Sequence, residues 1–329
     1  MSQVSSLESV TPALSIQLMN FAAKDPGPGG WQPLLDQARA ADAAGIDRLV
    51  LSDHVILGEH LEEYARPEVG GTKGGRQPTG PDGHWLEPMT LLSVLAGITS
   101  HSRLLTGILI AALRRPVVLA KSAATLDVLS RGRLDLGVGV GWQREEYEAA
   151  GMPFEGRGHL LDHTLDVCQT LWRNSSASYD SDLLQFEKIH CNPQPLQTGG
   201  VPFWVSGRLN ANVLRRIGRF GSGWIPWGDD AIDPGAGMPR VREALDQAGR
   251  DASGFQVTAA LPSVKGDAGL DLDRTMERVP SMVEAGITDF RAYLPIPDDP
   301  SSAEDFLSQV VSAFREATGR AGPSARDRG

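Results

Sequence analysis

The residues best suited to acid–base chemistry are Asp53 and His54, in the short sequence SDHV. The imidazole of histidine titrates nearest to neutral pH, so His54 is a candidate proton donor or acceptor. Asp53 could orient this ring or bind a polar group of a cofactor. A buried, hydrogen-bonded histidine without a catalytic role is an equally good interpretation of the position alone.

A glycine-rich turn is the first candidate for holding a cofactor. The sequence DLGVGVGW, residues 135–142, contains Val140, Gly141 and Trp142 and precedes a helical stretch. Glycines allow the backbone to come close to a ligand, and free N–H groups there could bind an anion. The spacing is not the G-x-G-x-x-G of dinucleotide-binding proteins, so the turn by itself is weak evidence.

A second candidate is the segment Ser206, Gly207 and Arg208, which precedes a helix. The N-terminus of that helix would attract a phosphate, and Arg208 could add positive charge. An ordinary helix cap explains the same residues. Arg114 and Arg115 form another basic spot.

Other chemistries have little support in the sequence. The seven histidines form no HxH or HExxH motif, so we expect no metal site, and no G-x-S-x-G elbow is present. Lys265 could form a Schiff base, although a solvated lysine is the simpler interpretation. The two cysteines, Cys168 and Cys191, form no CxxC motif, and Cys168 has the helical spacing of a core residue.

Composition restricts the partners of the chain. A net charge of -10 argues against a nucleic acid or an anionic membrane as the main partner. No apolar run approaches the ~18 residues needed to cross a bilayer. The first residues lack the pattern of a signal peptide, so we expect a cytoplasmic protein that acts on a small-molecule substrate.

Short aliphatic runs alternate with amphipathic stretches along the whole chain. The runs predict strands at residues 14–21, 48–52, 104–113, 134–140, 203–206, 224–227, 255–261 and 289–294. The stretches predict helices at residues 31–45, 87–99, 116–129, 160–172, 211–220, 238–248, 273–285 and 303–317. Eight alternating pairs favour a (β/α)8 TIM barrel, an α/β fold. We therefore expect residues 1–329 to form one catalytic domain, with the barrel at 14–317 and a disordered tail at 319–329.

Two segments do not fit the repeat. Residues 58–86 follow the second strand and are rich in glycine, proline and charge. Loops after barrel strands lie on the active-site face, so we interpret this segment as a lid, with plain disorder as the alternative. Residues 174–201 form an excursion without visible chemistry.

Four long stretches resemble one known family. They are AAGIDRLVLSDHV, WLEPMTLLSVLAGITSHSRLLTGILI, RRPVVLAKSAATLDVLSRGRLDLGVGVGWQREEYEAAGMPFEGRG and PFWVSGRLNANVLRRIGRFGSGWIP, between residues 42 and 227. They are similar to the luciferase-like monooxygenase superfamily, and most of all to its coenzyme F420-dependent oxidoreductase branch. This resemblance implies a bacterial-luciferase-like barrel.

The resemblance also implies roles for individual residues. His54 would act as acid or base near the reactive face of the cofactor, beside Asp53. The implied cofactor-binding residues are Asp53, Thr106, Gly107, Ile108, Val140, Gly141, Trp142, Ser206, Gly207 and Arg208. Gly107 and Ile108 would form a bulge, often a non-proline cis peptide, behind the ring system. The chain has SGR where relatives commonly have two glycines and a small polar residue, so Arg208 would either clash with the cofactor or strengthen its binding.

The expected reaction is hydride transfer between coenzyme F420, a deazaflavin, and a small organic substrate. The alternative is an FMN-dependent monooxygenase that uses oxygen and a separate flavin reductase; a non-catalytic flavin-binding relative and a barrel lyase are more distant. Phe21, Trp85 and Trp227 are candidate substrate-wall residues, or packing residues. We expect a homodimer, as in many soluble enzymes.

Overall fold

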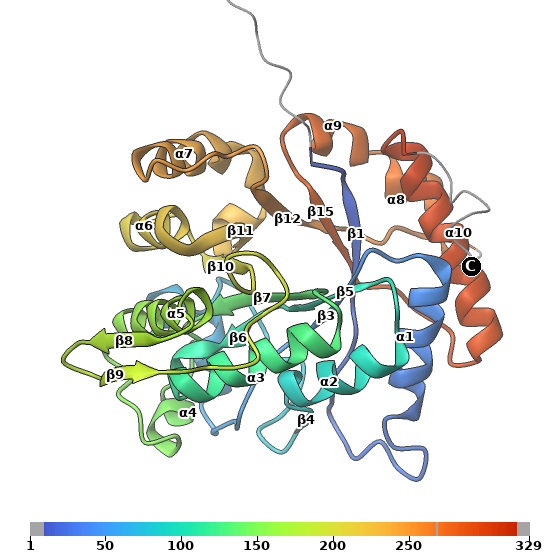
Figure 1. Cartoon of the computed structure of the whole chain (residues 1–329). Helices are drawn as coiled ribbons and strands as arrows, with labels where there is room; N and C mark the ends of the chain where they lie inside the picture. Colours follow the sequence, from blue (N-terminus) through green and yellow to red (C-terminus); the bar gives the residue numbers. More distant parts are fainter. Residues whose placement is uncertain (1–9, 268, 321–329) are drawn as a thin grey trace, which may run out of the picture.

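Eight parallel strands close into a barrel, with most of the helices outside it (Figure 1). In this computed structural model, which describes residues 10–267 and 269–320, the last strand pairs with the first. The barrel strands, in order, are β1 (Ala13–Gln17), β3 (Arg48–Leu51), β5 (Arg103–Thr106), β7 (Leu134–Gly139), β10 (Phe203–Gly207), β11 (Gly221–Pro226), β12 (Gln256–Leu261) and β15 (Asp289–Ala292). The predicted (β/α)8 barrel is confirmed.

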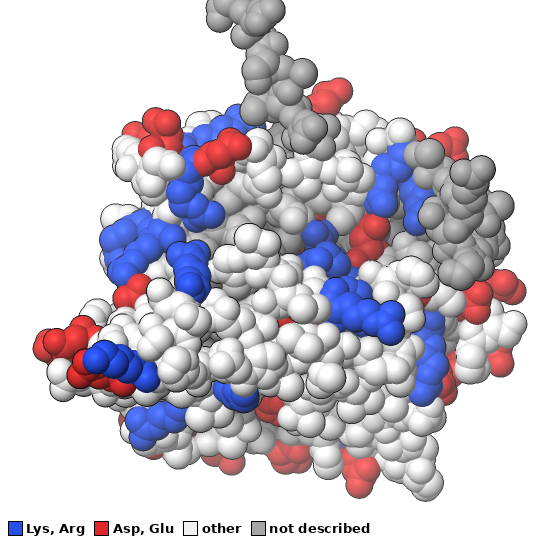
Figure 2. Space-filling view, in the orientation of Figure 1, with Lys and Arg blue, Asp and Glu red and all other residues white. Residues whose placement is uncertain are grey.

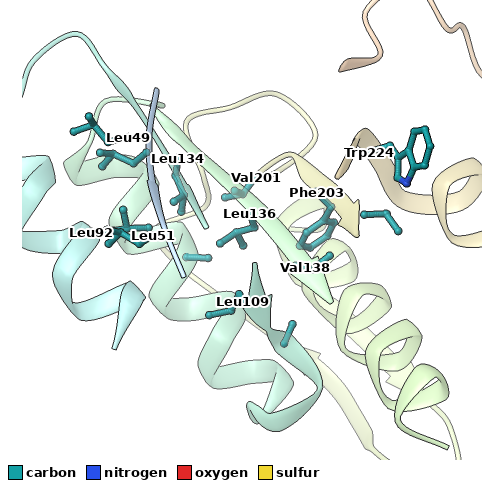
Figure 3. Packing of buried hydrophobic residues seen from close by; sticks show 14 of the residues in the cluster. Leu49, Leu51, Leu92, Leu109, Leu134, Leu136, Val138, Val201, Phe203 and Trp224 are labelled. Carbon is teal, nitrogen blue, oxygen red and sulfur yellow. The ribbon is translucent and has the colours of Figure 1, made fainter. Parts of the chain in front are cut away.

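The strands are buried on both faces, which explains their aliphatic composition. One face packs on the helices: Figure 3 shows Leu134, Leu136 and Val138 of β7 in a cluster with Leu92. The alternate residues point into the barrel, where Val50 and three other residues form a separate small core. Complete burial of a leucine such as Leu134 or Leu136 stabilises the fold by about 1.5–3 kcal/mol.

The surrounding helices begin and end close to the predicted positions. They are α1 (Gln32–Ala44), α2 (Pro88–Ile98), α3 (Pro116–Leu129), α5 (Arg157–Arg173), α6 (Ala211–Phe220), α7 (Pro234–Gln247) and α10 (Pro300–Ala317). Several have proline in the first turn, where no hydrogen bond is lost. Helix α1 ends at Gly45, whose left-handed φ of 85° favours glycine. None of the described helices is long and apolar enough to span a membrane.

Two predicted strands differ in detail. The run 104–113 is interrupted: β5 ends at Thr106, β6 (Leu109–Ile110) follows, and a 3-10 turn, η3 (Ala111–Leu113), completes it. A cis peptide between Gly107 and Ile108 marks the break. Strand β11 begins at Gly221 rather than at 224, and a Cβ at Gly223 would lie only 2.6 Å from the Trp204 ring. Only glycine leaves enough space for this ring. Because the first residues of β11 are therefore not aliphatic, a search for apolar runs does not detect the start of the strand.

The predicted helix at 273–285 is wrong as a single element, because α8 (Leu272–Met276) and α9 (Val279–Glu284) replace it. Pro280 has no N–H group and cannot continue a helical hydrogen-bond ladder. Of the expected tail, 319–329, residues 321–329 lie outside the described chain. Arg320 is not free, since it forms an ion pair with Asp47 at 2.7 Å.

The two insertions have structure of their own. Residues 174–201 contain an antiparallel hairpin, β8 (Ala177–Asp180) and β9 (Gln185–Ile189), which was not predicted. Residues 58–86 contain the 3-10 turns η1 (Leu61–Ala65) and η2 (Pro67–Val69). Strand β4 (His84–Trp85) then pairs with β2 (Phe21–Ala22), which places the end of this loop against the segment after β1.

Candidate active site

His54 lies just beyond the end of β3 and is buried, with 8% of its surface exposed. Its Nδ1 is 3.3 Å from Oε2 of Glu146, and its Nε2 is 3.1 Å from the amide nitrogen of Gln77. A carboxylate only accepts a hydrogen bond and an amide nitrogen only donates one, so these contacts suit the tautomer with the proton on Nδ1. The lone pair is then on Nε2, where it accepts the hydrogen bond from Gln77, and Nε2 is the atom suited to exchange a proton.

Glu146 holds this arrangement from helix α4 (Arg144–Ala149). Its side chain is completely buried, and Oε1 accepts a hydrogen bond of 2.6 Å from the backbone N–H of Val55. Glu146 therefore fixes both the ring of His54 and the chain that follows it. Sequence reasoning did not find Glu146, because 92 residues separate it from His54.

Asp53 is buried but does not hold His54. Its carboxylate accepts a hydrogen bond of 2.8 Å from the N–H of Ile110 and forms an ion pair with Arg114. Burial raises the pKa of Asp53 above its ordinary value, although Arg114 acts against this shift. Arg114 also contacts Glu87 at 3.0 Å, so it is engaged within the protein rather than free at the rim.

The break after β5 lies beside the end of β7. Thr106 donates a hydrogen bond of 2.8 Å from Oγ1 to the carbonyl of Gly137. A Cβ at Gly139 would lie 2.8 Å from the Ile108 side chain and 3.8 Å from Ser206. The structure thus brings together three of the segments proposed to hold a cofactor: the Thr106–Ile108 bulge, the turn at 139–141 and Ser206.

Aromatic rings form a continuous arc at the mouth of the barrel. Ring centroids of successive neighbours are 4.4 to 5.8 Å apart. In order, the rings are Phe21, Trp85, His54, Trp142, Tyr64 and Trp227. All three candidate wall residues belong to this arc. Tyr64 was missed, although it is the only aromatic residue between His54 and Trp85; burial and the neighbouring Tyr293 raise its pKa to about 12.

Side chains from the barrel hold residues 67–71 of the loop by their backbone carbonyls. Arg208 donates hydrogen bonds to the carbonyls of Pro67, at 3.1 Å, and Gly71, at 2.5 Å. The indole of Trp227 bonds to Gly70 at 3.0 Å, and Arg157 bonds to Val69 at 2.8 Å. We call these three side chains the loop clamp. In this structure the guanidinium of Arg208 binds the loop, and the phosphate role expected of it stays a prediction.

A hollow of about 420 Å³ opens where helices α5 and α6 begin, beside Val140. Arg215 and Arg216 line it and share one carboxylate, Asp162, each at 2.5 Å. Two guanidinium groups against one carboxylate leave a surplus of positive charge. The hollow also includes Asn210, two residues beyond Arg208, so the expected phosphate segment leads into it.

A larger hollow of about 740 Å³ lies outside the barrel, between α6 and α7. Arg215 lines both hollows, and Arg219, Arg240 and Arg250 continue along the second one. Arg240 and Arg250 donate hydrogen bonds to backbone carbonyls, of Leu209 at 2.6 Å and Ile217 at 3.1 Å. Figure 2 shows arginines gathered over α6, on the left of the view, with acidic side chains beside them over α7, and Glu243 also lines this hollow. We call the larger hollow the arginine groove.

No group of three or more His, Cys, Asp or Glu side chains suited to a metal ion occurs within residues 10–267 and 269–320. Cys168 is fully buried in the core, as its spacing predicted, and burial raises the pKa of its thiol.

Comparisons with known proteins agree with this architecture. The family model described as luciferase-like monooxygenase matches residues 14–278. An uncharacterised protein of Mycobacterium tuberculosis is 28% identical over 276 residues, which cover 83% of this chain and 89% of that protein.

Two solved structures share the fold at low sequence identity. An F420-dependent secondary alcohol dehydrogenase, in complex with an F420–acetone adduct, has a TM-score of 0.70 at 16% identity and covers 93% of this chain and 99% of its own. The oxygenating constituent of a 3,6-diketocamphane monooxygenase from Pseudomonas putida, in complex with FMN, has a TM-score of 0.68 at 14% identity and covers 96% and 100%. The match of the family model over most of the barrel shows that this chain belongs to the luciferase-like monooxygenase family.

Proposed function

We propose that the protein is an oxidoreductase that transfers a hydride between coenzyme F420 and a small organic substrate. The observation that carries this proposal is the continuity of two positive hollows through Arg215. The smaller hollow suits a phosphate beside the barrel mouth, and the arginine groove provides positive charge beyond it. An FMN side chain ends at one phosphate, whereas the deazaflavin tail carries further glutamates, which this groove would bind.

The residues at the barrel mouth fit such a group. The indole N–H of Trp142 is buried and has no hydrogen-bond partner in the described part of the chain. Gly139 lets its backbone lie close to the Ile108 side chain at the same place, and φ is 67° at Gly141. When bound there, coenzyme F420 supplies a ring carbon that accepts or donates a hydride.

The protein's own groups would handle the proton and exclude water. His54 exchanges the proton at Nε2, and Glu146 holds its Nδ1–H and stabilises the ring when it is charged. Gln77 now covers Nε2, and Tyr64 lies between Trp142 and Trp227. The loop at 58–86 must therefore open to admit a ligand and then close over it, as active-site lids do.

The proton role of His54 is tested with two substitutions. We expect His54→Asn to lower turnover at saturating substrate by ~10²–10⁴-fold, the usual contribution of a general acid or base. Glu146→Gln retains the size of the side chain but loses its charge, so it should lower turnover less and shift the pH profile of the rate. Full turnover by His54→Asn would refute the proton role, and an unshifted profile in Glu146→Gln would refute the positioning role.

The cofactor is tested by titrating the purified protein with coenzyme F420, with FMN and with the tail-less deazaflavin riboside, followed by fluorescence. We expect the tightest binding with F420. In the variant Arg219→Gln/Arg240→Gln, F420 affinity should fall by about tenfold or more, while the affinity for the riboside, which lacks the tail, is unchanged. One surface charge pair contributes only ~0.2–1 kcal/mol, but the loss of two positive charges acts on every negative charge of the tail. Tighter binding of FMN would instead assign oxygen-dependent monooxygenase chemistry, and binding of none of the three would refute the proposal.

A further inference from the structure

Arg291 is a buried cation whose guanidinium is incompletely hydrogen-bonded within the described residues. It belongs to β15, its side chain points into the barrel, and only 8% of the residue is exposed. Within the described residues, neither Nε nor Nη2 of this guanidinium has a hydrogen-bond partner. A buried guanidinium is rarely left without an acceptor, because its hydration is lost and not replaced.

The guanidinium reaches across the barrel to the break after β5. An ideal Cβ at Gly107 would lie 2.7 Å from Nη1 and 3.1 Å from Cζ of Arg291. The charged group thus occupies the space where any side chain at Gly107 would be. It lies against the bulge at Gly107 and Ile108, which the family resemblance places behind the ring of the cofactor.

The acid nearest in sequence, Asp289, is already engaged. Its carboxylate binds Arg48 at 3.1 Å, Thr258 at 2.9 Å and the hydroxyl of Ser15. Burial lowers the pKa of Arg291; Asp289 and Tyr293 act against this shift, and Arg48, a second buried cation nearby, adds to it. Arg48 also lies 3.8 Å from the buried Asp135, which Arg103 binds at 2.6 Å. Three guanidinium groups, those of Arg48, Arg103 and Arg291, thus stand against two carboxylates in this part of the barrel, and the site is suited to an electron-rich ligand.

We propose that Arg291 binds the carbonyl and ring-nitrogen edge of the cofactor's pyrimidine ring and stabilises its reduced form. This inference rests on the proposed function. Transfer of a hydride to the ring adds two electrons and one proton, so the negative charge of the ring increases by one. In deazaflavins and flavins that charge is shared between a ring nitrogen and the adjacent carbonyl, which are both acceptors for a guanidinium. Arg291 would offset the added charge without a proton transfer to the ring.

The proposal predicts that Arg291 distinguishes the two redox states of the ligand. In Arg291→Met, the dissociation constant of the reduced cofactor should increase at least about tenfold more than that of the oxidised cofactor. The reduced ring is anionic and loses a charge-assisted hydrogen bond to the guanidinium, whereas the oxidised ring loses only a weaker one. The midpoint potential of the bound cofactor, measured by equilibration with a reference couple, should fall accordingly. Arg291→Lys, which keeps the charge, should show a smaller change of the same sign.

Arg240→Gln is the matched control, because Arg240 lies in the arginine groove, away from the barrel interior. It should weaken both redox states equally and leave the midpoint potential unchanged. Arg291→Met should also raise the melting temperature of the ligand-free protein, because it removes a buried charge that has no partner. This second measurement shows that the variant is folded, and it does not depend on activity.

Equal weakening of both redox states in Arg291→Met, with an unchanged midpoint potential, would overturn the proposal. A variant that binds both states normally but has a raised KM for an anionic substrate would overturn it as well, and would assign the guanidinium to the substrate. If the unmodified protein binds FMN and not F420, the proposed function fails. The same comparison of oxidised with reduced FMN then tests Arg291 separately, since reduced flavin carries its charge on the same edge.

Discussion

The loop clamp should determine how often the loop at 58–86 opens. The substitution Arg208→Met keeps the aliphatic stem of the side chain and removes the hydrogen bonds to Pro67 and Gly71. Hydrogen bonds from charged donors contribute up to about 1.5–3 kcal/mol each, but Arg208 is partly exposed, so we expect about 1–2 kcal/mol for the two together. The equilibrium constant for opening should then increase about 5- to 30-fold.

Hydrogen exchange measures this opening directly. The amides of Gly71 and Thr72 donate hydrogen bonds to the carbonyls of Arg66, at 2.9 Å, and Tyr64, at 2.8 Å, within the loop. Their exchange should accelerate in Arg208→Met by the same factor, while the amide of Leu136 in the barrel should be unaffected. Trp227→Phe, which loses one neutral hydrogen bond, should have a smaller effect.

The matched control is Arg215→Met, which removes another partly exposed arginine that makes no contact with the loop in the described structure. Unchanged protection of Gly71 and Thr72 in Arg208→Met would refute the reasoning. So would equal acceleration in both arginine variants, because the effect would then come from a lost surface charge rather than from the clamp.

Two further predictions concern stability. Burial acts to raise the pKa of Asp42, but hydrogen bonds from the N–H groups of Ser102, Ser100 and His101 lower it below its ordinary value of 3.8. The stabilising contribution of Asp42 is therefore present above that value and is lost as the pH falls through the folded-state pKa. Asp42→Asn should lower the free energy of unfolding in urea by about 1–3 kcal/mol at neutral pH and by less in acid; a deficit that grows in acid would contradict this. Leu136→Ala should cost about 2–5 kcal/mol in the same assay, because Leu136 is completely buried. Leu129→Ala, at a residue 65% exposed, should change stability by about 0.5 kcal/mol or less, and similar losses in the two variants would contradict the packing described for β7.

The barrel could be predicted from the sequence because each strand is a local pattern. The run at 134–140 is aliphatic, ends in glycine-rich sequence and is buried on both faces, and the structure has β7 at Leu134–Gly139. The same rule missed the start of β11, where Gly223 leaves space for Trp204. The apolar run alone did not show the break at Gly107, since such a run does not show where its backbone turns; only the family resemblance implied the bulge and the cis peptide found there.

The site could be predicted only where its residues are neighbours in the sequence. Asp53 and His54 follow one strand, so barrel geometry placed them at the mouth. Glu146, Tyr64 and Arg291 come from a helix, a loop and a distant strand, and nothing in their local sequence indicates which side chain they will meet. The phosphate contact of Arg208 stays a prediction: a helix N-terminus suggested an anion, and only the tertiary structure shows that this arginine also bonds to two backbone carbonyls of the loop.

The clamp has a consequence for how this enzyme can change. Arg208, Trp227 and Arg157 all bind main-chain oxygens, so they recognise the path of the loop and not the identity of its side chains. A substitution at an exposed loop position that preserves this path leaves every one of these bonds in place. Exposed loop side chains can therefore be varied to suit a different substrate without weakening closure, whereas Tyr64, which packs between Trp142 and Trp227, also contributes to closure. Libraries that randomise loop side chains while keeping Pro67, Gly70 and Gly71 should yield many closed, folded variants with altered selectivity.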